Sequence, residues 1–97
     1  MANAARIGDP ITCGDNIAKG SGNVFINNQP AVRVGDATMG HGCWPPTIIA
    51  SGAGTVFVNN IPIVKVGDPI TPHTCVAPPF PTHGGTVASG SPNVFVE

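Results

Sequence analysis

The stretch that decides the fold is NVFINNQPAVRVGD, residues 23–36. Short apolar clusters flank the pair Asn27-Asn28, and asparagine tolerates the left-handed backbone that tight hairpin turns require. The stretch therefore predicts a strand, an asparagine turn and a return strand. In the return strand, Val32 and Val34 face one side and Arg33 the other, because side chains alternate along a strand.

Two signatures of this stretch occur three times along the chain, and such self-similarity indicates a repeat architecture. One is a Gly-Asp pair with a basic residue two places before the glycine, and the other is a Val-Phe pair. The equivalent residues are Arg6, Gly8-Asp9 and Val24-Phe25; Arg33, Gly35-Asp36 and Val56-Phe57; and Lys65, Gly67-Asp68 and Val94-Phe95. Six of the nine charged residues thus occupy equivalent positions, which indicates three structural units joined by loops of unequal length.

The two ends of the chain complement each other. The third repeat stops at NVFVE, residues 93–97, without a turn or a return strand. The chain begins with AARIGD, residues 4–9, which matches the return strands AVRVGD and IVKVGD. We therefore expect the last strand to pair with the N-terminal segment, because closure removes exposed strand edges. The predicted fold is all-β: residues 1–97 form a single closed, pseudo-threefold domain with neighbouring termini.

The composition excludes several classes of protein. Charged residues make up only 9% and the net charge is −1, so no basic surface for nucleic acid is expected. No apolar run approaches the length of a membrane span, and the N-terminus MANAARIGDP is not a signal peptide. We expect synthesis in the cytoplasm, and the odd number of cysteines argues against a complete disulfide framework. A closed pseudo-threefold fold with so few charges would present a weakly charged threefold face, and such a face suits the end of a trimeric rod.

Six soft metal ligands lie in the loops between the Gly-Asp and Val-Phe pairs. They are Cys13, His41, Cys43, His73, Cys75 and His83. The repeat frame makes His41 equivalent to His73, Cys43 to Cys75, and Cys13 to His83. In a closed fold these loops gather at one end, so that ligands from three loops meet near the axis. Cysteine and histidine together favour zinc.

Other interpretations of these residues remain open. Their spacing is not that of a zinc finger, and His-Gly dipeptides also serve as turns while cysteines serve as small core residues. A catalytic Cys-His pair is less favoured, because no charge or helix N-terminus activates a thiol and no carboxylate is expected beside the cluster. The prolines of WPP (44–46) and APPFP (77–81) stiffen the loops.

The segments AARIGD, AVRVGD and IVKVGD, together with TCGD, GHG, PHTC, THGG and GSPNVFV, resemble the PAAR-repeat proteins over essentially residues 4–97. The resemblance implies a small cone of short β-hairpins that binds the blunt end of a trimeric β-helical spike. Such proteins sharpen the tip of type VI secretion spikes and contractile phage tails. They bind zinc near the point through three histidines and one cysteine.

This stoichiometry implies a ligand set for the present chain. The three histidines are His41, His73 and His83, and Cys13 in TCG stands at the family-like ligand position. Cys75 is the rival, because it lies close to His73 in sequence. If Cys13 is the ligand, Cys43 and Cys75 are expected to be packing residues.

The function that the resemblance implies is structural rather than enzymatic. One chain would cap a homotrimeric β-helical spike, and its zinc-stabilised point would contact the target membrane mechanically. The protein would belong to a virion tail tip or be secreted with a type VI spike. Because the chain ends at Glu97, we expect a stand-alone tip without a toxic domain. The competing hypotheses are a small zinc-dependent hydrolase, with an accessible zinc and a general base, and a metal-binding or redox protein.

Overall fold

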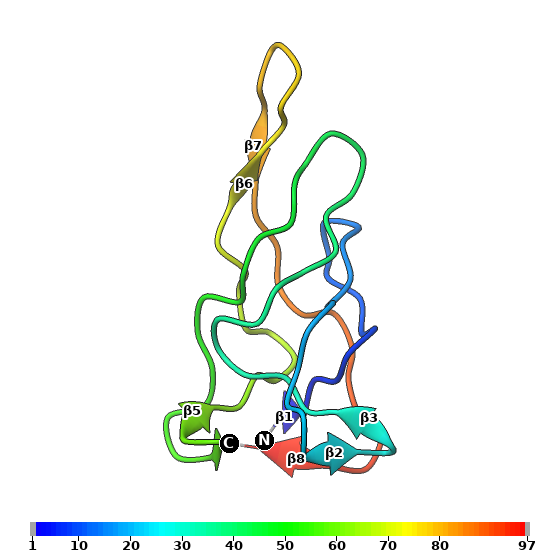
Figure 1. Ribbon diagram of the computed structural model, residues 1–97, viewed down its shortest axis with the longest axis vertical. Coiled ribbons are helices and arrows are strands. Elements are labelled where there is room, and N and C mark those ends of the chain that lie inside the picture. Colours follow the sequence, from blue (N-terminus) through cyan, green and yellow to red (C-terminus); the bar gives the residue numbers. More distant parts are fainter. Residues whose placement is uncertain (1, 97) are drawn as a thin grey trace.

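The computed structural model describes residues 2–96, and it contains only β-strands, turns and loops among them. Short strands of two residues pair there as four separate antiparallel ladders (Figure 1). The pairs are β1 (Ala2–Asn3) with β8 (Phe95–Val96), β2 (Phe25–Ile26) with β3 (Gln29–Pro30), β4 (Phe57–Val58) with β5 (Ile61–Pro62), and β6 (His73–Thr74) with β7 (Thr82–His83). The all-β class is confirmed; Met1 and Glu97 of the predicted domain lie outside the described residues. Residues 2–96 include no helix long and apolar enough to cross a membrane.

The β2–β3 and β4–β5 hairpins contain the predicted asparagine turns. The φ angles are 54° and 66° at Asn27 and Asn28, and 53° and 66° at Asn59 and Asn60. Positive φ at both central residues is the geometry of a type I′ turn, whose twist matches that of the flanking strands. Asparagine adopts this conformation at low cost, so the local sequence alone sets the register of both hairpins.

The chain closes on itself as predicted. Ala2 lies opposite Val96 and Asn3 opposite Phe95 in the β1–β8 ladder. Above it, one residue from each repeat joins a cycle of backbone hydrogen bonds. The amide of Ala5 donates to the carbonyl of Val64 at 2.9 Å, that of Val64 to Val32 at 2.9 Å, and that of Val32 to Ala5 at 3.3 Å. This cycle ties the three repeats together around a common axis.

The core consists of two stacked clusters whose members are largely repeat-equivalent. The lower cluster contains Ala4, Ala31, Ile63, Ile26, Val58, Val96 and Ala53. The upper cluster contains Ala5, Val32, Val64, Ile17, Ile49, Val87, Ile11 and Ile70. Each fully buried Val or Ile contributes roughly 1.5–3 kcal/mol. Neither cluster includes a residue of the two long loops at residues 39–46 and 72–84, called here the tip loops. These loops must be held by other interactions.

Each repeat turns a corner at its Gly-Asp pair. Gly8, Gly35 and Gly67 have φ angles of 90°, 90° and 95°, a region that side chains rarely adopt. The aspartate that follows accepts the backbone amide of the basic residue three places earlier and also pairs with its side chain. The ion pairs are Arg6–Asp9 at 3.0 Å, Arg33–Asp36 at 3.0 Å and Lys65–Asp68 at 2.6 Å. This accounts for the six charges at equivalent positions.

Asp36→Ala is expected to lower the free energy of unfolding by roughly 2 kcal/mol, because the amide and the guanidinium of Arg33 both lose their acceptor. Arg33→Lys is the matched control, since Lys65 makes the equivalent pair in the third repeat. The control should cost less than about 1 kcal/mol, because the carboxylate keeps a cationic partner. Denaturant titration measures both, and equal losses would contradict the assigned role of Asp36.

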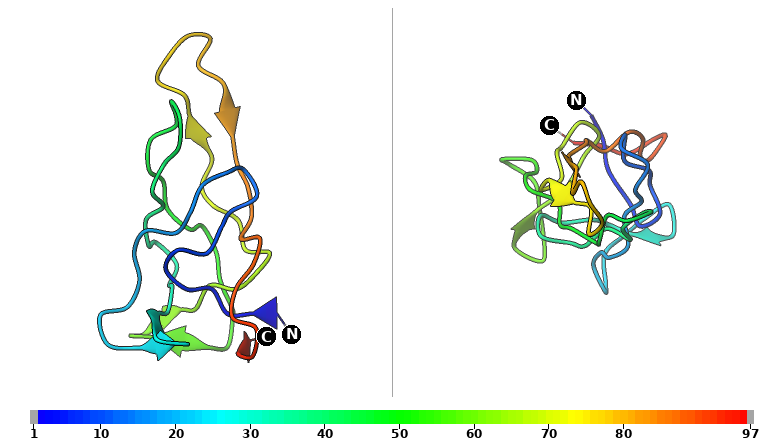
Figure 2. Two further views of the ribbon diagram at one scale, coloured as in Figure 1. Left: turned by 90° about the vertical axis from the view of Figure 1, so that its right-hand side faces the viewer. Right: turned by 90° about the horizontal axis from the view of Figure 1, so that it is seen from above.

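The molecule is a cone of 40 × 23 × 23 Å. The β2–β3 and β4–β5 hairpins and the β1–β8 pair form the broad end, where both described ends of the chain lie side by side (Figure 1). The tip loops rise to the narrow end, and the loop between β6 and β7 forms its apex (Figures 1 and 2). Variable loops therefore gather at one end of a constant base, as the repeat frame predicts.

Candidate metal centre

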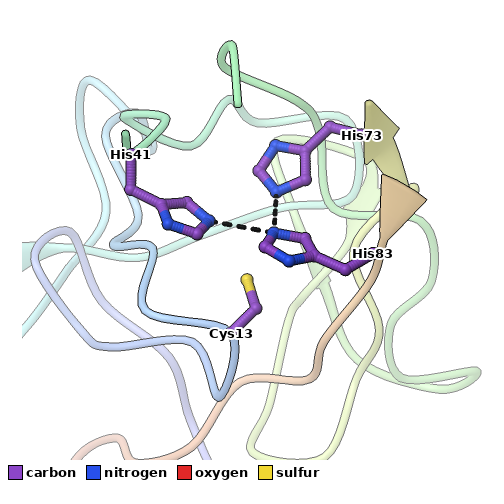
Figure 3. A group of neighbouring side chains, drawn as sticks. All are labelled: Cys13, His41, His73 and His83. Atoms are coloured by element: carbon purple, nitrogen blue, oxygen red, sulfur yellow. Dashed lines mark hydrogen bonds between the residues drawn. The ribbon is translucent and has the colours of Figure 1, made fainter. Parts of the chain in front are cut away.

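Four side chains from three loops converge below the apex (Figure 3). They are Cys13, His41, His73 and His83, and one ligand atom from each lies within 4.8 Å of all the others. These are the four residues expected as ligands from the sequence and the family resemblance, and the fold brings them together. They lie close enough to hold a metal ion.

The Cys13 loop is held from two sides. The amide of Thr12 donates to the carbonyl of Thr86 at 2.9 Å, and the amide of Thr86 donates to the hydroxyl of Thr12 at 3.0 Å. Gly14 has a φ of 101°, which reverses the chain directly after Cys13. A Cβ at Gly14 would lie 3.6 Å from Nδ1 of His41, so the two loops already touch.

His41 sits in a small turn of its own. Its amide and carbonyl exchange hydrogen bonds with Trp44 at 3.0 and 2.8 Å. Gly40 and Gly42 flank the histidine with φ angles of 78° and 53°. A side chain at Gly40 would meet the backbone of Trp44 and Pro46 at 2.9 Å, so the turn requires glycine there. These constraints aim the His41 ring at the axis.

His73 and His83 lie directly opposite each other in the β6–β7 hairpin. The sequence places both histidines in a loop between a Gly-Asp and a Val-Phe pair and does not predict this hairpin. Two two-residue strands next to a proline-rich segment leave no clear period in the sequence. The register places both imidazoles on one face, and His73 is 5% exposed. The hydroxyls of Thr74 and Thr82, 2.7 Å apart, form the next cross-strand pair.

The three imidazoles meet through their Nε2 atoms. His83 Nε2 lies 3.0 Å from His41 Nε2 and 2.8 Å from His73 Nε2. Nδ1 of His73 lies 2.8 Å from the carbonyl oxygen of Pro45 and must donate to it, because a carbonyl only accepts. In a neutral ring this leaves a lone pair on Nε2 of His73. A single proton on His83 Nε2 can form a hydrogen bond with only one of the two neighbouring Nε2 atoms. A cation placed among the three nitrogens can instead accept a lone pair from each of them.

The charge around the cluster also suits a cation. Burial, followed by the neighbouring His73 and His41, lowers the pKa of His83, which favours the neutral ring that a metal ligand requires. Asp15 acts in the opposite direction on the same pKa. Asp15 is buried, and its Oδ2 has no hydrogen-bond partner in the described chain. The donor set of one thiol and three imidazoles fits zinc.

The PAAR motif family matches the chain over residues 2–44 and again over residues 16–78. Together these two matches span more than half of the 97 residues. The chain belongs to the PAAR family. Members of this family are associated with the spikes of phage tails and secretion systems. The matched residues include Cys13, His41 and His73, whereas His83 lies beyond both matches. A search of curated proteins found no match.

The other two cysteines of this PAAR chain depart from expectation. Cys43 and Cys75 are expected from the sequence to be packing residues, but they form a disulfide across the tip loops. The sequence signal for this pairing was that Cys43 and Cys75 occupy equivalent positions in two repeats. The bond also removes Cys75 as the rival fourth ligand, since Cys13 is the free cysteine.

Trp44 covers the cluster and was assigned no such role from the sequence. Its ring stacks on His83 with centroids 4.1 Å apart and on His41 at 5.2 Å. Its Nε1 donates to the carbonyl of Pro81 at 3.1 Å, which ties the first tip loop to the β6–β7 hairpin. The WPP segment therefore does more than stiffen a loop: it supplies a cover through Trp44 and a hydrogen-bond acceptor for His73 through Pro45.

Proposed function

We propose that this PAAR chain is a structural spike-tip protein and not an enzyme. It caps the blunt end of a homotrimeric β-helical spike, one chain per trimer, and ends in a zinc-stabilised point. Residues 1–97 act as a single domain in this role. The observation that carries the proposal is the polarity of the cone, which has a threefold set of exposed phenylalanines at its base and a set of four metal ligands at its narrow end.

The base offers the same chemistry three times. Phe25, Phe57 and Phe95 are 56%, 55% and 49% exposed and occupy equivalent positions in β2, β4 and β8. The residue after each is buried in the lower core, because strand side chains alternate. The phenylalanines therefore face outward while their neighbours anchor the strands. Three equivalent apolar contacts from one chain suit three equivalent chains of a trimeric spike, together with edge-strand pairing.

The narrow end suits a rigid point. Residues 69–96 contain no Asp, Glu, Lys or Arg, and the tip loops lie outside both core clusters. Bound zinc would supply the folding energy that a hydrophobic core supplies elsewhere. Cys13, His41, His73 and His83 would hold it, with Pro45 fixing the tautomer of His73 and Trp44 excluding water. A narrow, rigid tip concentrates the force of contraction on a small area of the target membrane, which it contacts mechanically.

The proposal places the chain in a virion tail tip or with a secreted type VI spike, after synthesis in the cytoplasm. A zinc hydrolase is less well supported, because four protein donors fill a tetrahedral site and leave no open position. A redox protein has one favourable observation, the Cys43–Cys75 disulfide. It would require turnover of an external dithiol, which a standard disulfide-reduction assay measures. Turnover would displace the spike-tip proposal.

Co-purification with a trimeric β-helical spike is expected to give one PAAR chain per three spike chains. The combined variant Phe25→Ser/Phe57→Ser/Phe95→Ser should weaken this binding by at least about 100-fold, because buried aromatic anchors dominate interface energies. Phe80→Ser is the matched control: Phe80 is 55% exposed but lies at the other end, in the loop between β6 and β7. Calorimetry or size-exclusion chromatography reports both. An equal effect of Phe80→Ser would rule out docking through the base.

A further inference from the structure

The Cys43–Cys75 disulfide is built into the frame of the metal ligands. Cys43 follows His41 by two residues, and Cys75 follows His73 by two residues. The bond spans a sequence separation of 32 and brings the two Cα atoms to 4.8 Å. It therefore fixes the spacing between the loop that carries His41 and the hairpin that carries His73.

Apart from the stacking of Trp44 and His41 on His83 and the close approach of the histidines at the ligand cluster, three hydrogen bonds join these two tip loops. The amide of Val76 donates to the carbonyl of Cys43 at 3.0 Å, Trp44 Nε1 donates to Pro81, and His73 Nδ1 donates to Pro45. Val76 and Pro81 are exposed, so water competes for two of these three bonds. Neither core cluster reaches the tip loops. The disulfide is thus the one covalent link between the histidine-bearing loops in the described chain.

We propose that Cys43 and Cys75 are a redox-modified pair that sets how tightly the metal centre holds its ion. The proposal rests on the proposed function, because it needs a metal at Cys13, His41, His73 and His83. In the dithiol form only noncovalent contacts hold the loop of His41 against the hairpin of His73, so the two can separate more readily. In the disulfide form the two histidines are held at the spacing that the ion requires, so less freedom is lost on binding.

The oxidation balances by thiol–disulfide exchange with a small-molecule or protein disulfide. Cys43 and Cys75 together lose two electrons and two protons and form one S–S bond, while the oxidant is reduced to two thiols. A chain made in the reducing cytoplasm carries the dithiol, and an oxidising compartment converts it. Cys13 takes no part, because its sulfur belongs to the ligand cluster.

Thermodynamic linkage makes the effect reciprocal. If the disulfide raises zinc affinity by a given factor, zinc stabilises the disulfide over the dithiol by the same factor. Outer-shell supports of metal ligands typically change affinity by about 10- to 100-fold, and we expect about tenfold for this cross-link. A tenfold change corresponds to about 30 mV in the two-electron reduction potential of the disulfide.

The first experiment measures zinc release to a chromogenic chelator from oxidised protein and from protein treated with a phosphine reductant. The oxidised form should release zinc about tenfold more slowly. The variant Cys43→Ser/Cys75→Ser should release it as fast as the reduced protein and should not respond to reductant, which also controls for any binding of zinc by the reductant. Equal release from oxidised and reduced protein would overturn the proposal.

The second experiment needs no variant. The reduction potential of the disulfide is measured in a glutathione redox buffer with saturating zinc and with a chelator. We expect it to be about 30 mV more negative with zinc. An unchanged potential would mean that the disulfide only braces the fold. Absence of zinc from both redox forms would instead overturn the proposed metal-stabilised tip, and with it this inference. Spike binding should be the same for both forms, because the disulfide lies at the end opposite the base.

Discussion

Cys13→Ser is expected to abolish stoichiometric zinc binding and to lower the melting temperature in zinc-containing buffer by about 15–30 °C. Serine leaves three imidazoles without the thiolate that completes the set. A ligand present at about a thousand times its Kd stabilises a folded chain by roughly 4 kcal/mol, and each kcal/mol is worth about 4–8 °C for a chain of this size. Metal analysis of the purified protein gives the stoichiometry, and calorimetry gives the melting temperature.

The control for Cys13→Ser must account for the disulfide. Cys43→Ser/Cys75→Ser also destabilises the chain, by roughly 3–4 kcal/mol on the chain-entropy estimate for a loop of this length. Melting temperature alone therefore does not separate the two variants. Zinc content does, because the double variant keeps all four ligands and should still bind one ion per chain. Full zinc occupancy in Cys13→Ser, or its loss only in the double variant, would refute the assigned ligand set.

The fold was predictable because the repeats contain residues that specify their own turns and corners. The asparagine pairs specify the type I′ turns, and the Gly-Asp pairs specify the corners with their partly buried ion pairs. The N-terminal segment and the C-terminal NVFV specify closure: β1, directly before AARIGD, pairs with β8, and the amide of Ala4 donates to the carbonyl of Val94 at 2.9 Å. Because the same kinds of turn and corner residues recur along the chain, few alternative folds fit the sequence, even though each strand has only two residues.

The candidate site was predictable as a set of residues but not as a geometry. Repeat phasing placed the soft ligands in loops that converge, and family resemblance selected Cys13. Neither could show that His73 and His83 face each other across a hairpin, because the Pro-rich segment between them has no strand period. The disulfide, the stack of Trp44 on His83 and the carbonyl of Pro45 depend on how the tip loops meet in space.

Gly52→Ala is expected to lower the free energy of unfolding by roughly 3 kcal/mol, or the melting temperature by about 12–24 °C. A Cβ at this position would lie 2.5 Å from the carbonyl oxygen of Ile63 and 2.9 Å from a methyl group of Val34. The Ile63 carbonyl cannot move aside freely, since it accepts the amide of Ala53 at 2.8 Å. The crowding recurs in the other repeats, where a Cβ at Gly20 would lie 2.7 Å from Ala31 O and one at Gly90 would lie 2.4 Å from Ala4 O.

Gly54→Ala is the matched control, two residues further along the same segment. No atom lies within 4 Å of a Cβ built at Gly54, and its φ is not in the left-handed region. The substitution should be neutral to within about 0.5 kcal/mol or slightly stabilising, because alanine reduces the freedom of the unfolded chain. The equivalent position in the third repeat already carries Pro92.

Chemical denaturation of both variants decides the point. A similar loss from each would mean that glycine serves these segments through flexibility, whereas a loss confined to Gly52→Ala places the requirement in the close approach of one repeat to the next. That approach sets the three base hairpins, and with them Phe25, Phe57 and Phe95, at the spacing that a trimeric spike would meet.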